Sequence, residues 1–428
     1  MMKYQRPTGT NDILPDQQPY WRYIFDRIHH VAALYGYQQI EPPIFEDTAV
    51  FARGVGEATD IVQKEMYTFE DRGGNSLTLR PEFTAGVIRA YIENGMHVLP
   101  QPVKLYSIGP AFRHDRPQAN RYRQFWQFNA EAIGEQDPAV DLEIMSLAWQ
   151  LYQELGLTEI SFQVNSTGCP KCRPAYVAKL ADYFRQHEHR LGEDDRRRLV
   201  TNPLRILDTK DERIQDLVEA APRIGDYLCD ECQTHFDTLL SYLDLQGRPY
   251  TINPRLVRGL DYYTKTVFEV WSSALGGAQS AISGGGRYDG LAEILGGDPT
   301  PGVGYAAGIE RMISLMQELG VEPPALPSPQ VALIYLGAEA KRACITLVSE
   351  LREQDLGALM FFGDPSMRSQ MRSANRAGVK YALILGEQEL EQGMVAVKDM
   401  LSDTPQQLVD RGVIVEWLNQ QLNGSRPQ

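Results

Sequence analysis

Residues 104–133 constrain the fold of this chain more than any other stretch, because two strand-forming runs there flank one short polar loop. Residues 125–133 alternate strictly, and residues i and i+2 of a strand share a face. One face is an ordinary packing face, formed by Trp126, Phe128, Ala130 and Ala132. The opposite face is polar at its centre and apolar at its ends, and it comprises Phe125, Gln127, Asn129, Glu131 and Ile133. Because unpaired polar groups are costly in a buried sheet, this second face favours a floor that contacts a ligand.

The loop between the two runs is rich in potential cations. They are Arg113, His114, Arg116, Arg121 and Arg123, with Asp115 as the only acid. A solvated hairpin tip is the simplest explanation of such a loop. Guanidinium groups, however, match phosphate oxygens in pairs and stay charged. Beside a floor that carries Gln127 and Glu131, the loop therefore predicts a polyphosphate site next to a site for a cationic or donor-rich substrate, as for ATP beside an amino acid.

The segment FRHDRPQANRYRQFWQ resembles motif 2 of the class II aminoacyl-tRNA synthetases, most closely the version found in histidyl-tRNA synthetases. The resemblance implies that Arg113 contacts the α-phosphate of ATP and that Arg121 contacts the departing phosphates. It also implies that Gln127 and Glu131 bind histidine.

Two segments before this stretch resemble the same family. GYQQIEPPIF is similar to motif 1, which builds the dimer interface in class II enzymes, although an edge strand ended by prolines explains it equally well. In LRPEFT, Pro81 is expected at position N1 of a helix. A glutamate in the first turn, such as Glu82, usually serves only to compensate the helix dipole. The resemblance implies that Glu82 and Thr84 hold the α-amino group of histidine. Phe83 departs from the smaller residue expected there.

Three later segments complete the resemblance. RGLDYY is similar to the first histidine-specific signature, which implies that Arg258 contacts the histidine carboxylate and the α-phosphate, and that Tyr262 and Tyr263 line the histidine site. The two tyrosines would lie on opposite faces if residues 251–270 were extended, and buried tyrosines are more often core residues. SGGGRYDGL is similar to the second signature, with Tyr288 in the histidine pocket and three glycines expected after a strand, where a plain turn would also explain them.

The segment GVGYAAGIERMISLMQELG predicts a glycine-rich strand that continues into an amphipathic helix. It resembles motif 3 of the class II enzymes. The resemblance implies that Arg311, near the start of the helix, contacts the γ-phosphate of ATP, where the helix dipole also favours an anion.

Four of the five cysteines form two CxxC pairs, Cys169 with Cys172 and Cys229 with Cys232. Two thiolates spaced in this way can chelate one ion in tetrahedral geometry, and a helical hairpin could bring the pairs together. A disulfide is disfavoured in a reducing cytosol. Four inert thiols remain the alternative to a structural Zn²⁺ site.

The last hundred residues predict a separate domain. Strand and helix patterns alternate beyond the Pro-rich residues 321–330, which predicts an α/β fold with a mostly parallel sheet. A helix expected over residues 366–380 places like charges at spacings of four, where they repel. These are Arg368, Arg372, Arg376 and Lys380. A solvated helix face explains this row of positive charges as well as contact with RNA does. The place of the segment in the family's anticodon-binding domain favours contact with tRNA.

The length of 428 residues predicts two or three domains. We expect an α+β catalytic domain on an antiparallel sheet, of class II synthetase type, with a helical insertion, followed by the α/β anticodon-binding domain. The expected ranges are 1–167 and 249–322 for the catalytic domain, 168–248 for the insertion, 323–330 for a linker and 331–428 for the anticodon-binding domain.

Composition excludes several classes of partner. The net charge of −14 counts against sequence-blind DNA binding, although a local basic surface can still contact RNA. No apolar run approaches the roughly 20 residues of a membrane span, and the first residues lack a signal-peptide core. The sequence therefore predicts a cytoplasmic protein without a membrane or DNA partner.

The resemblance covers nearly the whole chain and implies a homodimeric ligase. Such an enzyme activates histidine with ATP and Mg²⁺, forming histidyl-adenylate and pyrophosphate, and then transfers histidine to tRNA-His. One alternative is a non-catalytic regulatory subunit of ATP phosphoribosyltransferase, which shares the catalytic fold but typically lacks the anticodon domain. Another is a different class II ligase that uses a small amine, which gives no reason for the two histidine signatures.

Overall fold

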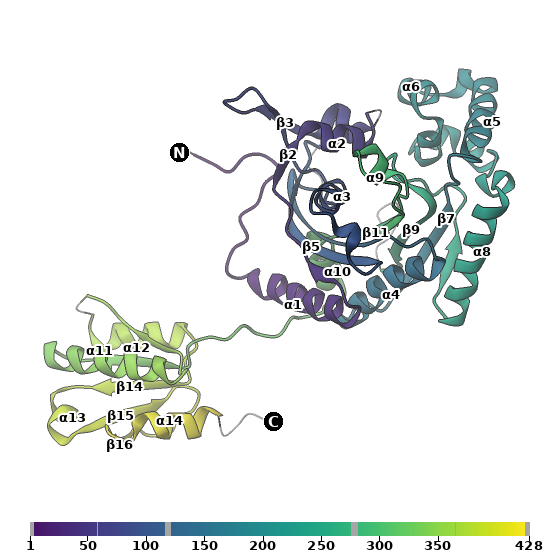
Figure 1. Cartoon of the computed structure of the whole chain (residues 1–428). Coiled ribbons are helices and arrows are strands. Elements are labelled where there is room, and N and C mark those ends of the chain that lie inside the picture. Colours follow the sequence, from purple (N-terminus) through teal and green to yellow (C-terminus); the bar gives the residue numbers. More distant parts are fainter. Residues whose placement is uncertain (1–3, 58, 116–120, 275–280, 364, 424–428) are drawn as a thin grey trace. The chain divides into compact units, whose positions relative to one another are not determined.

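The computed structural model describes residues 4–57, 59–115, 121–274, 281–363 and 365–423. The chain divides into two compact units, Met1–Pro324 and Ala325–Gln428 (Figure 1). Residues 321–330, predicted as a linker, carry no helix or strand. Among the described helices, none combines the length and the apolar character that a bilayer-spanning segment needs.

The first unit is built on an eight-stranded sheet in the order β1-β5-β6-β11-β10-β9-β7-β8. Its strands are β1 (Gln38–Gln39), β5 (Val103–Phe112), β6 (Gln124–Ile133), β7 (Ile160–Ser166), β8 (Tyr250–Ile252), β9 (Thr264–Ser272), β10 (Ala281–Arg287) and β11 (Gly302–Gly308). The pairs are antiparallel from β5 to β7, and parallel pairs, β1 with β5 and β7 with β8, end the sheet. The predicted α+β fold on an antiparallel sheet is confirmed.

Four helices cover one face of this sheet. They are α1 (Gln18–Leu34), α4 (Pro138–Glu154), α8 (Asp230–Leu245) and α10 (Ile309–Glu318). The predicted packing face of β6 lies in this core, where the Trp126 ring contacts Trp21 and Phe25 at centroid distances of 5.8 and 5.7 Å. Leu34, the last residue of α1, is 58% exposed.

The opposite face of the sheet is covered only in part. Helices α2 (Thr48–Val55), α3 (Thr84–Glu93) and α9 (Leu291–Ile294) pack there, and α3 and α9 contact apolar residues at the ends of β5 and β6. A small sheet of β2 (Phe45–Asp47), β4 (Ser76–Leu79) and β3 (Tyr67–Glu70) lies beside α2. A turn at Gly73-Gly74 joins β3 to β4, and Gly74 has a φ of +80°.

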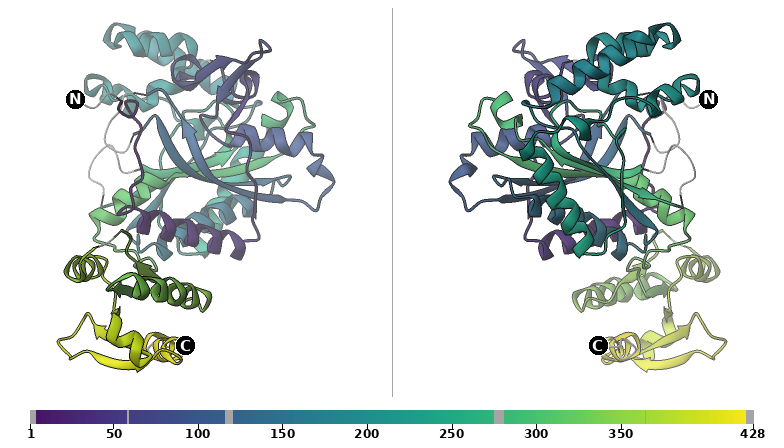
Figure 2. Two further views of the ribbon diagram at one scale, coloured as in Figure 1. Left: turned by 90° about the vertical axis from the view of Figure 1, so that its left-hand side faces the viewer. Right: turned by 90° about the vertical axis from the view of Figure 1, so that its right-hand side faces the viewer.

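The region between β7 and β8 is mainly helical, as predicted. Helices α5 (Arg173–Gln186), α6 (Glu193–Thr201) and α7 (Gln215–Glu219) build a separate apolar core with the short 3₁₀ turns between them. In Figure 1 and Figure 2, α5 and α6 lie together outside the sheet. Helix α8 packs instead along α4, and its Phe236, Leu239 and Leu243 join the core of the main sheet.

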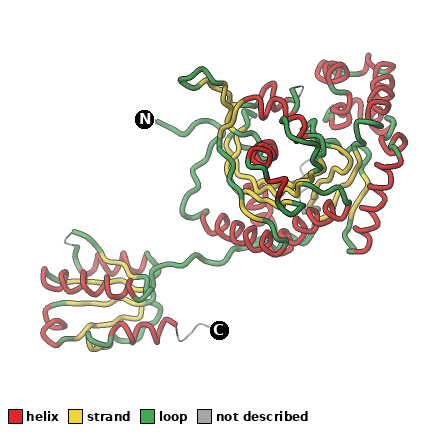
Figure 3. Tube along the Cα trace, viewed as in Figure 1, coloured by secondary structure: helices red, strands yellow, loops and turns green. Residues whose placement is uncertain are grey.

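The second unit has a five-stranded sheet in the order β13-β12-β14-β15-β16. The strands are β12 (Val331–Tyr335), β13 (Ala358–Met360), β14 (Tyr381–Leu385), β15 (Met394–Asp399) and β16 (Gln407–Asp410). The helices are α11 (Ala338–Glu353), α12 (Met367–Arg376), α13 (Glu387–Gln392) and α14 (Ile414–Asn423). Figure 3 shows the helices of each unit around its strands.

Two details of this unit differ from the sequence-based expectation. The sheet is mixed, since β12 pairs in parallel with β13 and β14 whereas β15 is antiparallel to both neighbours. The strand β16 was not predicted. Helix α12 ends at Arg376 because the chain turns at Gly378, which has a φ of +67°, so Lys380 is not part of the predicted helical stripe.

Candidate active site

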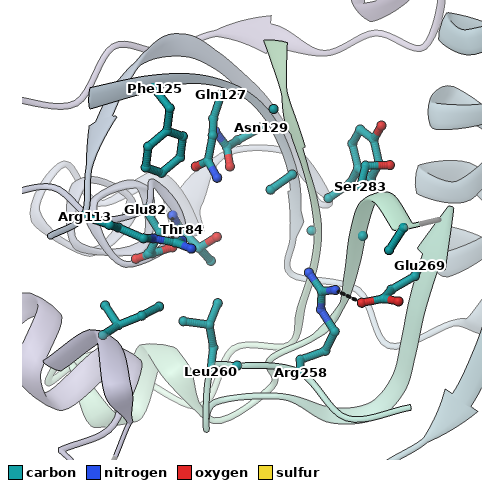
Figure 4. A pocket seen from close by; sticks show the side chains of 18 of the residues that line it. Glu82, Thr84, Arg113, Phe125, Gln127, Asn129, Arg258, Leu260, Glu269 and Ser283 are labelled. Atoms are coloured by element: carbon teal, nitrogen blue, oxygen red, sulfur yellow. Dashed lines mark hydrogen bonds and ion pairs between the residues drawn. The ribbon is translucent and has the colours of Figure 1, made fainter. Parts of the chain in front are cut away.

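A cavity of about 440 Å³ lies on the partly covered face of the main sheet. Its floor is the polar face of β6, represented by Gln127 and Asn129. In Figure 4, Arg113 lies near Glu82 and Thr84 on one side of the cavity, and Arg258 lies on the other side. The structure therefore brings together residues from three of the segments that the sequence analysis singled out: residues 104–133, LRPEFT and RGLDYY.

The floor carries polar atoms that have no partner among the described residues. Gln127 Oε1 and Asn129 Nδ2 are buried and make no hydrogen bond. Buried polar groups in proteins are nearly always paired, so two such atoms on the lining of one cavity indicate a site built for a polar ligand. The strict alternation of residues 125–133 is what allowed this floor to be predicted.

Glu131 is on the same face of β6 but is buried below the cavity lining, of which it is not a member. Its carboxyl group accepts hydrogen bonds from Thr84 Oγ1 at 2.7 Å and from Tyr288 Oη at 2.6 Å. Burial raises the pKa of Glu131 to about 8, although these two hydroxyl groups act in the opposite direction. A Cβ at Gly304 would stand 1.8 Å from Glu131 Oε2, so a glycine is required opposite this carboxyl group.

Glu82 caps a helix rather than lying in its first turn. Its carboxylate accepts from the backbone N–H groups of Thr84 at 2.7 Å and Ala85 at 2.9 Å. The expectation that Pro81 is the N1 residue was wrong, because these hydrogen bonds start α3 at Thr84. Phe83 finds room in the core, where the Arg80 guanidinium lies 4.0 Å from its ring centroid.

Arg113 follows directly after β5 and borders the cavity. Its Nε donates to the Pro81 carbonyl at 2.9 Å, and its guanidinium lies 5.4 Å from the centroid of the Phe125 ring. Burial lowers the pKa of Arg113, while Glu65 and Glu82 favour its charged form. Arg121 also lines the cavity and pairs with Asp115 at 3.2 Å. Arg116 lies outside the described residues.

Arg258 faces the floor from the segment that precedes β9. Its Nη1 pairs with Glu269 Oε1 at 2.5 Å, and Glu269 belongs to the adjoining strand β9. Burial lowers the pKa of Arg258, but Tyr263 and Glu269 outweigh it, so the net shift is upward and the group stays charged. Gly284 makes room for it, since a Cβ there would stand 2.8 Å from Arg258 Nη1.

The two tyrosines of RGLDYY lie in a loop, not in a strand. Residues 253–263 contain no strand, and the rings of Tyr262 and Tyr263 contact each other at 4.8 Å between centroids. The conditional expectation that they lie on opposite faces therefore does not apply. Both tyrosines line the cavity, and the Tyr262 ring also contacts the ring of Tyr288 edge-on at 5.9 Å.

The three glycines of SGGGRY lie inside β10 rather than after a strand. A Cβ at Gly285 would stand 2.0 Å from the Gly304 carbonyl oxygen. At Gly286 a Cβ would meet the Thr266 carbonyl oxygen at 2.4 Å and the Tyr263 ring at 2.9 Å. These glycines therefore allow close packing of the chain against itself, and Gly284 and Gly286 also make room for the cavity-lining side chains of Arg258 and Tyr263.

Arg311 completes the cationic lining. It lies in the first turn of α10, as predicted, and its Nη1 donates to the Ala281 carbonyl at 2.6 Å. The neighbouring Glu310 also borders the cavity and accepts from the Trp126 backbone N–H at 2.9 Å. Burial raises the pKa of Glu310 to about 7.

Several lining residues were missed because they carry no local signal. Glu269, the partner of Arg258, sits in an ordinary strand pattern. Arg205 of the helical region pairs with Asp60 at 3.1 Å, and both border the cavity. These pairs join residues distant in sequence, so only the fold brings them together.

The four paired cysteines meet, as their spacing predicted. Their sulfur atoms all lie within 4.8 Å of one another, and three of the pairs are 3.8, 3.8 and 3.9 Å apart. A tetrahedral zinc site with Zn–S bonds of about 2.3 Å has sulfur atoms about 3.8 Å apart. All four are free thiols, and three are buried. Their arrangement matches the geometry of a tetrathiolate metal site.

The arginines of α12 lie away from any described partner. Arg368, Arg372 and Arg376 are exposed, and among the described residues they form no ion pair or hydrogen bond with another side chain. Lys380, beyond the helix, donates from Nζ to the Gln421 carbonyl at 3.2 Å and lies over the Tyr381 ring.

Comparisons with known proteins agree with this geometry. A family model described as histidyl-tRNA synthetase matches residues 9–171 and 177–312. The chain belongs to the histidyl-tRNA synthetase family. A second family model, anticodon binding domain, matches residues 330–421 of this synthetase.

Histidine–tRNA ligases of other organisms match the synthetase over nearly its full length. It is 52% identical over 397 residues to the histidine–tRNA ligase of Dehalococcoides mccartyi strain 195, a match that spans 93% of this chain and 95% of that protein. It is 47% identical to the histidine–tRNA ligase of Pelotomaculum thermopropionicum, over 98% and 99% of the two chains. The crystal structure of apo histidyl-tRNA synthetase from S. aureus has 37% identity and a TM-score of 0.81, covering 97% of this chain and 99% of that one.

The synthetase is therefore a class II histidine–tRNA ligase with an anticodon-binding domain. These matches do not favour the regulatory-subunit alternative. A structure titled ATP phosphoribosyltransferase regulatory subunit/histidyl-tRNA synthetase, from Bacillus halodurans, shares the fold at 21% identity and a TM-score of 0.63.

Proposed function

We propose that the cavity binds histidine against Glu131 and the triphosphate of ATP between Arg113, Arg258 and Arg311. The observation that carries this proposal is the shared lining: three guanidinium groups border the same cavity as the unpaired floor amides of Gln127 and Asn129. Guanidinium forks bind phosphate oxygens strongly, and the floor offers the donors and acceptors that an amino acid needs.

The histidine end of the site would be the end at Glu131. An imidazole N–H that donates to Glu131 stabilises the ionised form of a carboxyl group whose pKa of about 8 is already near neutrality. Tyr262, Tyr263 and Tyr288 enclose this end with aromatic surface. Glu82 and Thr84 at the start of α3 are the proposed partners of the α-amino group.

In the first step the carboxylate of histidine attacks the α-phosphorus of ATP in line. The bond to the bridging oxygen breaks, pyrophosphate leaves, and histidyl-adenylate forms. Arg113 and Arg258 stabilise the negative charge that develops on the α-phosphate, and Arg121 and Arg311 hold the departing phosphates. Catalysis then depends on positioning and charge rather than on a protein nucleophile.

In the second step the 3′-terminal ribose hydroxyl of tRNA-His attacks the histidyl carbonyl, and AMP leaves. The exposed Arg368, Arg372 and Arg376 of α12, with Lys380 beyond the helix, are proposed to contact tRNA phosphates.

Mg²⁺, when bound, would neutralise charge on the ATP phosphates, and the Glu310 carboxylate beside Arg311 would be an oxygen donor for it.

We infer that Cys169, Cys172, Cys229 and Cys232 hold one structural Zn²⁺ ion, which the spacing of their sulfur atoms supports.

The proposed domains are 1–167 with 249–322 for catalysis, 168–248 as an insertion, 323–330 as a linker and 331–428 for the anticodon. The packing of α8 along α4 suits an insertion whose last helix is anchored on the catalytic core. The proposed location of the enzyme is the cytoplasm.

The proposed homodimer would form through the motif 1 region. Phe45 and Phe69 of the small sheet are 51% and 43% exposed, and their rings contact each other at 6.3 Å. Ile44 beside them is also exposed. Adjacent exposed apolar side chains of this kind are typical of interfaces.

Histidine-dependent exchange of pyrophosphate into ATP tests the proposal. The purified chain should catalyse exchange with histidine and with none of the other amino acids. Exchange with a different amino acid would overturn the histidine assignment. Absence of exchange with any amino acid, in protein that binds ATP, would favour a non-catalytic protein.

A further inference from the structure

The four-cysteine cluster is joined to the proposed histidine site by one partly buried arginine, Arg173. Arg173 follows Cys172 directly in the chain. Its Nε donates to the Thr167 carbonyl at 2.8 Å, and its Nη2 donates to the Gly168 carbonyl at 3.2 Å and to the backbone carbonyl of Tyr263. The same guanidinium therefore contacts both the start of the cluster and the loop that carries the cavity tyrosines.

Lys265 forms a second link between the same two regions. Its Nζ pairs with Glu231, which lies between Cys229 and Cys232, at 3.0 Å. On its other side Nζ lies 3.7 Å from Asp289, the residue after Tyr288. The Lys265 side chain is only 7% exposed, whereas its partner Glu231 is 53% exposed.

The backbone between the cluster and the loop is tightly packed. The Lys265 N–H donates to the Gly168 carbonyl at 2.8 Å, and the Thr167 N–H donates to the Lys265 carbonyl at 2.7 Å. Gly168 has a φ of +66°, and a Cβ there would stand 2.9 Å from Cys172 Sγ. A shift of Cys172 would therefore displace both Gly168 and Arg173. Gly168 contacts Lys265, and Arg173 contacts the Tyr263 carbonyl.

A bound metal changes how firmly this region is held. Four thiols at 3.8 to 3.9 Å interact only weakly with one another. Coordination by one zinc ion would fix the segments 169–172 and 229–232 to each other, because structural zinc sites contribute directly to folding energy. The zinc complex of four thiolates is also anionic, which favours the cationic Arg173 beside it.

We propose that Arg173 is a positioning residue for histidine: the metal-bound cysteine cluster holds its guanidinium on the Tyr263 carbonyl, so metal occupancy sets the affinity for histidine. This inference rests on the proposed zinc site and extends it, since a purely structural ion would leave substrate affinity unchanged. Arg173 does not line the described cavity, so its effect would act through Tyr263.

The test uses the full-length enzyme as purified and separates the KM for histidine from kcat in pyrophosphate exchange. The variant Arg173→Gln should raise the KM for histidine about tenfold, as loss of an outer-shell partner of a metal site commonly does. The KM for ATP should not change, and Arg173→Lys should restore part of the histidine affinity. The matched control is Arg190→Gln, because Arg190 also bridges residues of the helical region, through Asp216 and the Arg213 carbonyl, but contacts no part of the tyrosine loop.

Metal removal tests the same link without a mutation. Zinc is counted by mass spectrometry before and after chelation, and the stripped enzyme should show the same rise in KM for histidine, reversed by added zinc. Stripping Arg173→Gln should cause no further rise, since coupled perturbations are not additive. If Arg173→Gln fails to fold, stripped wild-type enzyme still decides the question.

The outcomes separate the two ideas. Stoichiometric zinc whose removal leaves the KM for histidine unchanged would overturn the positioning role and leave the zinc site standing. Absence of metal in freshly purified, active enzyme would overturn both. An equal rise in KM in Arg190→Gln would show general loosening of the helical region and would also overturn the positioning role.

Discussion

Glu131 is the residue whose chemistry depends most on its burial. With a pKa raised by burial to about 8, the folded protein binds a proton that the unfolded chain, at an ordinary value of 4.5, has already released. The folded state therefore holds more protons between these values, so this group's contribution to stability is greatest below pH 4.5 and falls as pH rises towards 8.

The variant Glu131→Gln should remove this pH dependence. A full proton difference between the folded and unfolded states changes the free energy of unfolding by about 1.4 kcal/mol per pH unit. Urea midpoints of the wild type should therefore fall more steeply than those of Glu131→Gln between about pH 5 and about pH 8. Parallel curves for the two proteins would show that Glu131 is ionised throughout this range.

Arg258 is expected to act mainly on the transition state. Replacing it by alanine should lower the exchange rate by roughly 10²- to 10³-fold, as loss of a preorganised charge does. Histidine binding should weaken less, because the charge matters most where negative charge develops. Pyrophosphate exchange and equilibrium binding measure the two effects.

Arg255 provides the control for this prediction. It lies three residues earlier in the same segment and is exposed. It forms a long surface ion pair with Glu219, at 3.8 Å. Arg255→Ala should leave exchange unchanged. Wild-type exchange in Arg258→Ala would remove Arg258 from the mechanism.

At the scale of elements, a buried ion pair joins α4 to β10. Arg287 donates to Asp141 at 2.7 to 2.8 Å, and both side chains are 0% exposed. His235 of α8 lies 3.3 Å from the same carboxylate. Because Tyr288 follows Arg287 directly and lines the cavity, this network also holds one wall of the proposed histidine site.

Removing one charge of this pair should be costly. Asp141→Asn leaves the buried Arg287 guanidinium with only the more exposed Asp289, 3.2 Å away, as a counter-charge, and breaking a buried pair typically costs about 3–5 kcal/mol. Thermal unfolding should show a clear drop in the melting temperature of the first unit. The exposed pair of Arg185 and Asp182 offers a comparison, and Asp182→Asn should have little effect. Similar results for both variants would contradict the role assigned to the buried pair.

Elements with a local signal could be predicted from the sequence, and those fixed by distant contacts could not. The β5–β6 hairpin was predicted because alternation reports directly on which face is buried. The start of α3 was missed because it depends on which backbone N–H groups the Glu82 side chain reaches. An extended conformation was considered for residues 251–270, since tyrosines favour strands. Residues 253–263 form a loop instead, and their packing around the cavity decides its shape.

The same distinction holds for the site. Arg113, Gln127, Arg258 and Arg311 could be proposed because their segments resemble motifs of known function, and all four line the described cavity. The partner of Arg258, Glu269, sits in an ordinary strand pattern, and only the fold brings the two side chains together. No spacing rule of the sequence could indicate it.

At the scale of the whole molecule, the two units should contribute separately to the reaction. Adenylate formation is proposed to use only the cavity of the first unit, whereas recognition of tRNA is proposed to involve α12 of the second. Replacing Arg368, Arg372 and Arg376 together by glutamine should weaken aminoacylation of tRNA-His and leave pyrophosphate exchange unchanged. The loss of three phosphate contacts would make the salt dependence of tRNA binding shallower by about 2–3 in the log–log slope.

Arg342→Gln on α11 is the matched control for this variant, since Arg342 is equally exposed in the same unit. It should change neither reaction. The triple variant should fold at least as well as the wild type, because it removes repulsion between like charges at i,i+4. Unchanged aminoacylation in the triple variant would assign tRNA contact to another surface.

A crystal structure with both histidine and ATP bound tests the central claim most directly. The imidazole should lie against Glu131, with the tyrosines around it, and the α-phosphate should lie between Arg113 and Arg258. Density for histidine elsewhere, with Glu131 still held only by Thr84 and Tyr288, would contradict the assignment of this cavity as the site of histidine activation.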